Sequence, residues 1–189
     1  MRRIALASAI LLSAASLQPA HAATLAGVTL PDTAEVGGKT LTLNGLGLRK
    51  KLFIKVYVAG LYLESKQSDP AAILAADTTR RGTMNFVFDV GQEKICNEGW
   101  KEGLAENTPN ASAEVKAQFD TLCSYMEDMK DGDAMSFDYV PGTGTTVIVK
   151  GNTKGTIPGK AFSDGLFGCW LGPKPGPGAD FKSALLGKS

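Results

Sequence analysis

Apolar residues occupy both faces of the run at residues 52–63, because odd and even positions are equally rich in large hydrophobic side chains. This pattern is typical of a central strand that is covered on two sides. Gly45 and Gly47 come just before it and suit a tight turn, so we expect the alternating residues 39–43 to pair with it. Gly60 removes a side chain in mid-strand, which predicts a bend or room for a group that lies on the sheet.

Similar patterns extend over the rest of the chain. Alternation predicts further strands at residues 27–30, 83–90, 134–140, 145–150 and 156–157. Apolar positions at helical spacing, together with capping residues, predict helices at residues 70–76, 93–106, 112–130, 160–171 and 180–186. Hairpin-linked strands with a helical layer indicate an α+β fold, in which a large antiparallel β-sheet carries helices on one face.

The first 22 residues have the pattern of a secretory signal peptide. Arg2 and Arg3 precede a short apolar segment, and Ala20-His21-Ala22 is a small-residue cleavage site. We expect cleavage after Ala22, a single domain at residues 23–189 and a periplasmic location. The alternative is an uncleaved anchor. No later stretch is long and apolar enough to cross a membrane, so we expect no integral membrane segment after signal removal.

Removal of the signal changes the charge and the chemistry that the chain offers. Arg2 and Arg3 leave, so 18 basic residues face 19 acidic ones, and this overall charge indicates neither nucleic acid nor an anionic membrane as partner. The single histidine, His21, leaves as well. This excludes Ser–His and Cys–His catalysis and any histidine-ligated metal site, and we expect neither a metal nor a cofactor. The oligomeric state stays open.

Three cysteines follow the signal. Cys96 and Cys123 lie at similar distances on either side of the break between two predicted antiparallel helices, and both fall on inward faces. We predict a disulfide between them, since an exported protein folds in an oxidising compartment. The alternative is two buried free thiols. Cys169 would be left over, and without a histidine to activate it we interpret it as a buried thiol.

The segment Gly-x-Gly-x-Arg at residues 45–49, followed by Phe-Ile-Lys-Val-Tyr-Val-Ala-Gly-Leu-Tyr-Leu-Glu, resembles the opening hairpin of the chalcone isomerase family, and of its bacterial exported members in particular. Further matching pieces occur in the same order at residues 85–90, 100–107, 132–133, 139–142 and 162–172. The resemblance spans residues 28 to 187. It implies a large curved sheet of the open-faced β-sandwich type, with a ligand cleft between sheet and helices.

The resemblance gives Arg49 a role. In chalcone isomerases the matching arginine polarises the substrate, and in the plant fatty-acid-binding relatives it holds a carboxylate. A guanidinium is always charged and its fork of donors suits a carboxylate or an oxyanion. The alternative is an arginine in solvent beside Lys50 and Lys51.

The rest of the family's catalytic set matches poorly. Its strand threonine aligns with Tyr57, which keeps a hydroxyl that could hydrogen-bond a carboxylate beside Arg49. Its other three residues align near Gly91, near Glu98 and with Cys169. Because only the arginine is retained, flavanone-forming cyclisation is not expected, and whether the protein is an enzyme at all is left open.

Three functions therefore remain as hypotheses. The first is a periplasmic, non-catalytic binder of a small amphipathic carboxylic acid such as a fatty acid, with Arg49 and Tyr57 as ligand-binding residues. The second is an isomerase or intramolecular lyase in which Arg49 stabilises an oxyanion. The third is a structural or partner-binding protein without ligand. An open apolar cleft at which Arg49 and Tyr57 converge would favour the first two.

Overall fold

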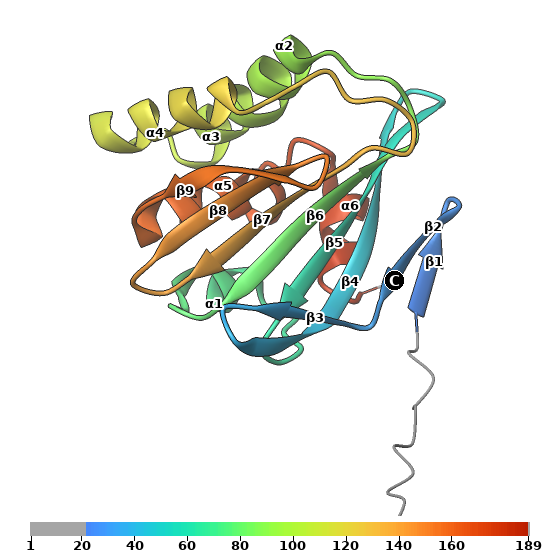
Figure 1. Cartoon of the computed structure of the whole chain (residues 1–189), viewed down its shortest axis with the longest axis horizontal. Coiled ribbons are helices and arrows are strands. Elements are labelled where there is room, and N and C mark those ends of the chain that lie inside the picture. Colours follow the sequence, from blue (N-terminus) through green and yellow to red (C-terminus); the bar gives the residue numbers. More distant parts are fainter. Residues whose placement is uncertain (1–21, 189) are drawn as a thin grey trace, which may run out of the picture.

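Seven antiparallel strands form one curved sheet, and each strand pairs with its neighbour along the chain (Figure 1). The computed structural model describes residues 22–188, so all but the last residue of the predicted signal peptide, residues 1–22, lies outside the described residues. The strands are β3 (Thr33–Val36), β4 (Lys39–Lys51), β5 (Ile54–Leu63), β6 (Arg80–Phe86), β7 (Ala134–Val140), β8 (Gly144–Val149) and β9 (Asn152–Ile157).

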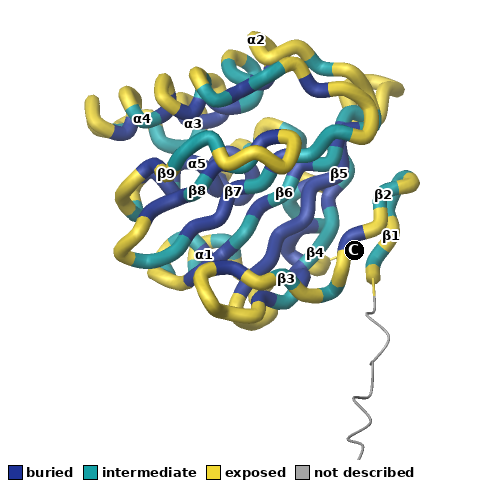
Figure 2. Tube along the Cα trace, viewed as in Figure 1, coloured by how far each residue is buried: buried dark blue, intermediate teal, exposed yellow. Residues whose placement is uncertain are grey.

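The helices cover one face of this sheet and share a hydrophobic core with it (Figures 1 and 2). They are α1 (Pro70–Ala75), α2 (Gln92–Lys94), the π-helix η1 (Ile95–Lys101), α3 (Glu102–Asn107), α4 (Ala113–Ser124), α5 (Lys160–Leu171) and α6 (Ala179–Leu185). The α+β fold with helices on one face of a large antiparallel sheet is confirmed.

A small separate hairpin, β1 (Ala22–Leu25) and β2 (Val28–Pro31), packs against the other face of the sheet. Tyr62 donates a hydrogen bond from its hydroxyl to the Pro31 carbonyl at 2.9 Å. A Cβ on Gly60 would come within 2.7 Å of the Leu30 side chain, so the group that lies on the sheet at this glycine is β2. The central strand β5 is therefore covered on both faces, as its sequence predicted.

The predicted turn at Gly45 and Gly47 is wrong. Strand β4 runs through both glycines to Lys51, and the turn is formed by Leu52 and Phe53 instead. The two glycines instead allow β4 and α6 to pack closely. A Cβ on Gly45 would overlap the Ala184 carbonyl oxygen, and one on Gly47 would lie 2.8 Å from the Phe181 ring, so the missing side chains let α6 lie on β4.

Other element boundaries also differ from their predicted positions. Helix α4 ends at Ser124 instead of residue 130, and the predicted strand 83–90 is displaced to β6. The last parts of both predicted elements meet instead in an isolated backbone bridge, in which Val90 and Met129 exchange two hydrogen bonds of 2.8 Å. Met129 is buried by this extended pairing, although its position in the sequence is equally consistent with a helix face. Strand β3 was not predicted, and β9 is longer than its predicted core.

Candidate functional site: an apolar cavity at Arg49

A cavity of about 300 Å³ lies between the sheet and the helices. Its walls come from β4, β5 and β6, from the loop after β6, and from η1 and α5. Most of the lining is apolar: Leu52, Ile54, Val56, Tyr57, Met84, Phe86, Phe88, Val90, Ile95, Trp100, Cys169, Trp170 and Pro177. The charged side chains of the lining are Arg49, Lys51, Asp89, Lys94 and Glu98. An apolar chamber with a few convergent polar groups is the usual form of a small-molecule site.

Arg49 and Tyr57 converge on this cavity from neighbouring strands. They are cross-strand partners in β4 and β5, and the guanidinium carbon of Arg49 lies 5.8 Å from the centre of the Tyr57 ring. Arg49 is half-buried and Tyr57 is buried. Among residues 22–188, no acidic side chain forms an ion pair with Arg49. Lys51 is hydrogen-bonded to the nearby Glu98 carboxyl and lowers its pKa, an effect to which the charge of Arg49 adds. Arg49 is therefore left without a carboxylate partner among these residues.

Tyr57 is a neutral hydrogen-bond donor at this position. Burial raises the pKa of its phenol, and the positive charge of Arg49 opposes that effect only in part. A phenol that keeps its proton can donate to a carboxylate, whereas a phenolate would repel one. Because Arg49 and Tyr57 lie side by side, one carboxylate could accept from both.

Cys169 lies in the cavity wall and is chemically passive. Burial raises the pKa of its thiol to about 12, so it stays protonated at neutral pH. The thiol donates a hydrogen bond to the Gly165 carbonyl at 3.3 Å within α5. A thiolate is the nucleophilic form of cysteine, and this environment disfavours it.

Glu98 stands at the mouth of the cavity. It forms an ion pair of 2.7 Å with Lys51, which joins η1 to the end of β4. The hydrogen bond from Lys51 lowers the pKa of the Glu98 carboxyl. Gly91, which aligns near another catalytic position of the resembled family, caps α2 and is not part of the cavity lining.

A second, polar hollow of about 210 Å³ shares Arg49, Lys51 and Glu98 with the apolar cavity. The rest of its lining includes Glu102, Glu106 and Lys174. Arg49 therefore stands at the boundary between an apolar chamber and a polar opening. An amphipathic acid needs such a boundary, since its head is charged and its tail is not.

The π-helix is the part of the site that sequence patterns did not predict. Residues 93–106 were expected to form one α-helix, but the middle of this segment has the wider π geometry. Single π turns are frequent at functional sites. Here η1 supplies Ile95, Glu98 and Trp100 to the cavity, and the Trp100 indole N–H is buried without a hydrogen-bond partner among the described residues.

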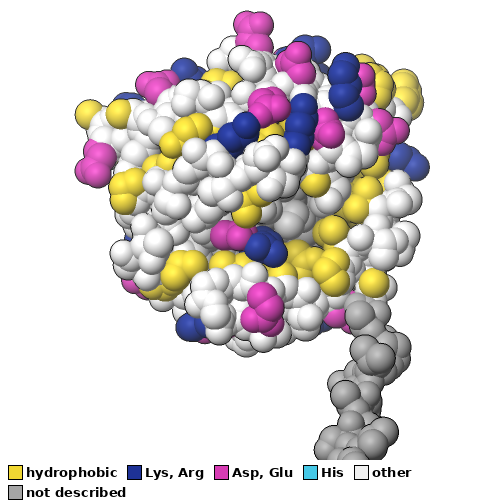
Figure 3. Space-filling model, in the orientation of Figure 1, with side chains coloured by type: hydrophobic (Ala, Val, Ile, Leu, Met, Phe, Trp, Pro, Cys, Tyr) yellow, Lys and Arg dark blue, Asp and Glu magenta, His cyan; other side chains and the backbone are white. Residues whose placement is uncertain are grey.

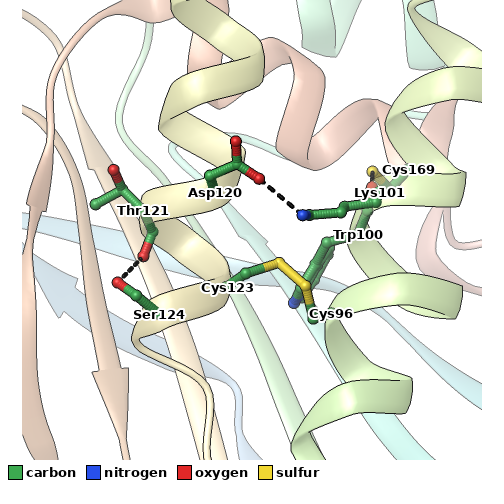
Figure 4. The surroundings of a disulfide bond; sticks show 8 residues. All are labelled: Cys96, Trp100, Lys101, Asp120, Thr121, Cys123, Ser124 and Cys169. Atoms are coloured by element: carbon green, nitrogen blue, oxygen red, sulfur yellow. Dashed lines mark hydrogen bonds and ion pairs between the residues drawn. A yellow bond between two sulfur atoms is a disulfide. The ribbon is translucent and has the colours of Figure 1, made fainter.

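A disulfide fixes this helix to its neighbour. Cys96 of η1 and Cys123 of α4 are bonded, with their Cα atoms 5.2 Å apart, so the predicted pairing is confirmed (Figure 4). An ion pair of 2.7 Å between Lys101 and Asp120 links the same two elements. The cavity wall that carries Glu98 and Trp100 is thus held by a covalent bond.

No group of three or more His, Cys, Asp or Glu side chains within residues 22–188 is arranged to hold a metal ion. No helix in the same range has the length and hydropathy needed to cross a membrane.

Comparison with known proteins gives a family and a fold. The sequence profile of the chalcone isomerase-like family matches residues 22–187. Among solved structures, the fold is similar to that of a fatty-acid binding protein from Arabidopsis thaliana, with a TM-score of 0.70 at 15% sequence identity. The similarity covers 88% of this chain and 96% of the plant protein. A comparison of the sequence with curated proteins finds no match.

Proposed function

The chain belongs to the chalcone isomerase-like family, and from this premise we propose that it binds a small amphipathic carboxylic acid, such as a fatty acid, without transforming it. One observation carries the proposal: Arg49 is half-buried at the edge of an apolar cavity, beside the neutral donor Tyr57, and no acidic side chain of residues 22–188 pairs with it. The fold shared with a plant fatty-acid binding protein supports the same interpretation.

The geometry suggests how such an acid would lie. Its carboxylate would accept hydrogen bonds from Arg49 and Tyr57, and its tail would contact Met84, Phe86 and Trp100. A volume of about 300 Å³ is at the lower end of ligand pockets. We therefore expect a medium-length chain, or a longer one whose end leaves through the mouth.

A calorimetric titration with two ligands of equal tail length tests the proposal. Dodecanoic acid carries the carboxylate and 1-dodecanol does not. The wild type should bind the acid at least about tenfold more tightly, because a charge-assisted pair with arginine contributes on the order of 1.5–3 kcal/mol. In Arg49→Gln this preference should vanish while binding of the alcohol persists.

Lys55→Gln is the matched control, since it removes a positive charge from an exposed site that is not part of the cavity lining. It should keep the preference for the acid. Equal preference in the wild type and in Arg49→Gln would refute a role for Arg49, and no binding of either ligand by the wild type would refute the binder.

The isomerase alternative draws on the same arginine. It also needs a general base, and the buried groups beside Arg49 do not supply one, because burial raises the pKa values of Tyr57 and Cys169 and keeps both protonated. The Glu98 carboxylate in the cavity lining is paired with Lys51. We give precedence to binding because Arg49 and Tyr57 suffice for it. Turnover of a chalcone by the purified protein would reverse that order.

We also propose that the protein acts in the periplasm. The disulfide in a helical wall of the cavity suits an oxidising compartment, and the N-terminal sequence has the pattern of a secretory signal. Cell fractionation with mass measurement of the mature N-terminus tests this. Recovery from the periplasmic fraction with Ala23 first supports it, and an intact chain in the cytoplasm contradicts it.

A further inference from the structure

The exposed large hydrophobic side chains of residues 22–188 gather at one end of the molecule. They are Phe53, Leu52, Phe88 and Ile54, with exposed fractions of 100%, 88%, 46% and 45%. Leu52 and Phe53 form the turn between β4 and β5, and Ile54 is the first residue of β5. This end of the hairpin projects from the end of the sheet beside the loop that follows β6 (Figure 1). Hydrophobic side chains are visible over this end in the space-filling view (Figure 3). Apolar side chains gathered on a surface in this way mark interaction sites.

Several features of the turn between β4 and β5 are unfavourable for its stability. Leu52 has a φ of 55°, the left-handed conformation that glycine or asparagine adopts at lower cost. Lys50 and Lys55 are direct cross-strand partners at the base of the turn, and like charges in that arrangement repel each other. Phe53 is fully exposed to solvent. The repulsion between the lysines and the exposure of Phe53 would be offset by a partner that takes up apolar side chains and carries negative charge.

An anionic lipid surface has both properties. Its acyl region accepts leucine and phenylalanine side chains, and its negative potential attracts lysines close to the headgroups. Lys50 and Lys55 lie directly behind the apolar residues, while Lys51 is paired with Glu98. The order along the hairpin is thus apolar at its end and basic at its base, which matches the order of acyl chains and headgroups in a bilayer.

We propose that the hairpin tip, residues 50–55, docks on an anionic lipid bilayer. Docking would bring the mouth of the cavity to the surface of the bilayer. Leu52, Ile54 and Phe88 belong both to the exposed cluster and to the cavity lining. An acid that leaves the bilayer at this point enters the cavity without passing through bulk water. The docking proposal is argued from the hairpin tip alone. Only the identity of the transferred molecule, an amphipathic acid, rests on the proposed function.

A fluorescent reporter on the tip measures insertion directly. The full chain with Phe53→Cys is labelled with an environment-sensitive dye, since Cys169 is buried and the other two cysteines form the disulfide. Thr143→Cys is the matched control, because Thr143 is exposed in the β7–β8 turn at the opposite end of the sheet. With vesicles of phosphatidylcholine and phosphatidylglycerol, the dye at position 53 should shift to the blue and be quenched by nitroxide lipids. The dye at position 143 should do neither.

Substitutions separate the apolar and the charged contributions. Phe53→Ser should weaken partitioning into the mixed vesicles about tenfold, whereas Phe53→Trp should restore it. The double variant Lys50→Gln with Lys55→Gln should lose roughly tenfold on the mixed vesicles and little on phosphatidylcholine alone. All these chains share residues 1–21, so differences between them report the tip.

Solution binding of dodecanoic acid separates the two proposals. Phe53 is outside the cavity lining, so Phe53→Ser should bind the acid like the wild type when no vesicle is present. If the wild type binds the acid but the dye on labelled Phe53→Cys does not shift with vesicles, the docking proposal alone is overturned. A shift at position 53 without acid binding supports docking and refutes the binder. If the protein does not bind vesicles but self-associates in a way that depends on Phe53, the tip binds a second copy of the chain instead of a bilayer. That result would overturn the proposal.

Discussion

Single residues decide where the elements of this fold touch. Gly45 and Gly47 lie in the middle of β4, under α6, and their missing side chains set the distance between strand and helix. Arg49 follows two residues later on the same strand and reaches the cavity. The spacing of the Gly-x-Gly-x-Arg segment therefore combines a packing requirement with the candidate binding residue.

Gly45→Ala should destabilise the protein by about 2–3 kcal/mol, because the new methyl group would overlap the Ala184 carbonyl and the backbone of α6 would have to shift. Urea unfolding measures the loss. Gly99→Ala is the control: its Cβ would meet no neighbouring atom and it lies within a helix, so its stability should be unchanged or slightly higher. Equal effects of the two substitutions would contradict the close-packing role of Gly45.

Cys169 should make stability fall at alkaline pH. Its folded pKa of about 12 lies above the ordinary value of 9.0, so between these values the unfolded thiol loses its proton and the folded one keeps it. The unfolded state then binds fewer protons, and stability decreases as pH rises, by about 1.4 kcal/mol per unit. Urea unfolding at about pH 8 and about pH 10 should show a loss of about 1 kcal/mol in the wild type relative to Cys169→Ala. Parallel pH dependence in the two proteins would contradict it.

The positions of two arginines, Arg80 and Arg49, could not be predicted from residue type alone. Arg80 is fully buried under α5, where it donates to the Ser163 hydroxyl at 2.9 Å and pairs with Asp164 at 2.6 Å. Nothing in the local sequence distinguishes it from a solvated arginine, because its side-chain partners Ser163 and Asp164 lie more than 80 positions away. Arg49 was singled out only through its family resemblance, since charge alone indicates a surface position.

At the scale of elements, the strands and helices with regular patterns were predicted well, and their ends were not. Helix α5 and the paired strands β7 and β8 lie close to their expected positions because their apolar spacing is regular. The turn at Leu52 and Phe53 was missed because both residues continue the apolar pattern of the strand. The π geometry of η1 was missed because a hydrogen bond that spans one residue more than in an α-helix leaves no mark in a short apolar pattern.

The disulfide between η1 and α4 should stabilise the folded protein. Removal of both cysteines in Cys96→Ala with Cys123→Ala, or reduction of the wild type, should cost about 3 kcal/mol, since the bond closes a loop of 27 residues. Urea unfolding with and without reductant measures this. Reductant should leave the stability of the double variant unchanged. A wild type that is equally stable in its oxidised and reduced forms would contradict the prediction.

At the scale of the whole molecule, the curved sheet and the helical layer enclose an apolar chamber whose polar edge is Arg49 and whose mouth lies beside the exposed β4–β5 turn. The family resemblance predicted a cleft between sheet and helices, but not its size or its opening. These depend on how η1, α5 and the turn pack together, which involves contacts between residues far apart in the sequence.

The most direct test of the central claim is the carbon-13 spectrum of carboxyl-labelled dodecanoic acid bound to the wild type and to Arg49→Gln. In the wild type we expect a distinct bound resonance whose titration midpoint lies below that of the same acid bound to the variant, because the guanidinium stabilises the carboxylate. Identical bound resonances and midpoints in the two proteins would place the carboxylate away from Arg49. A wild-type spectrum that contains only free acid would refute the binding site itself.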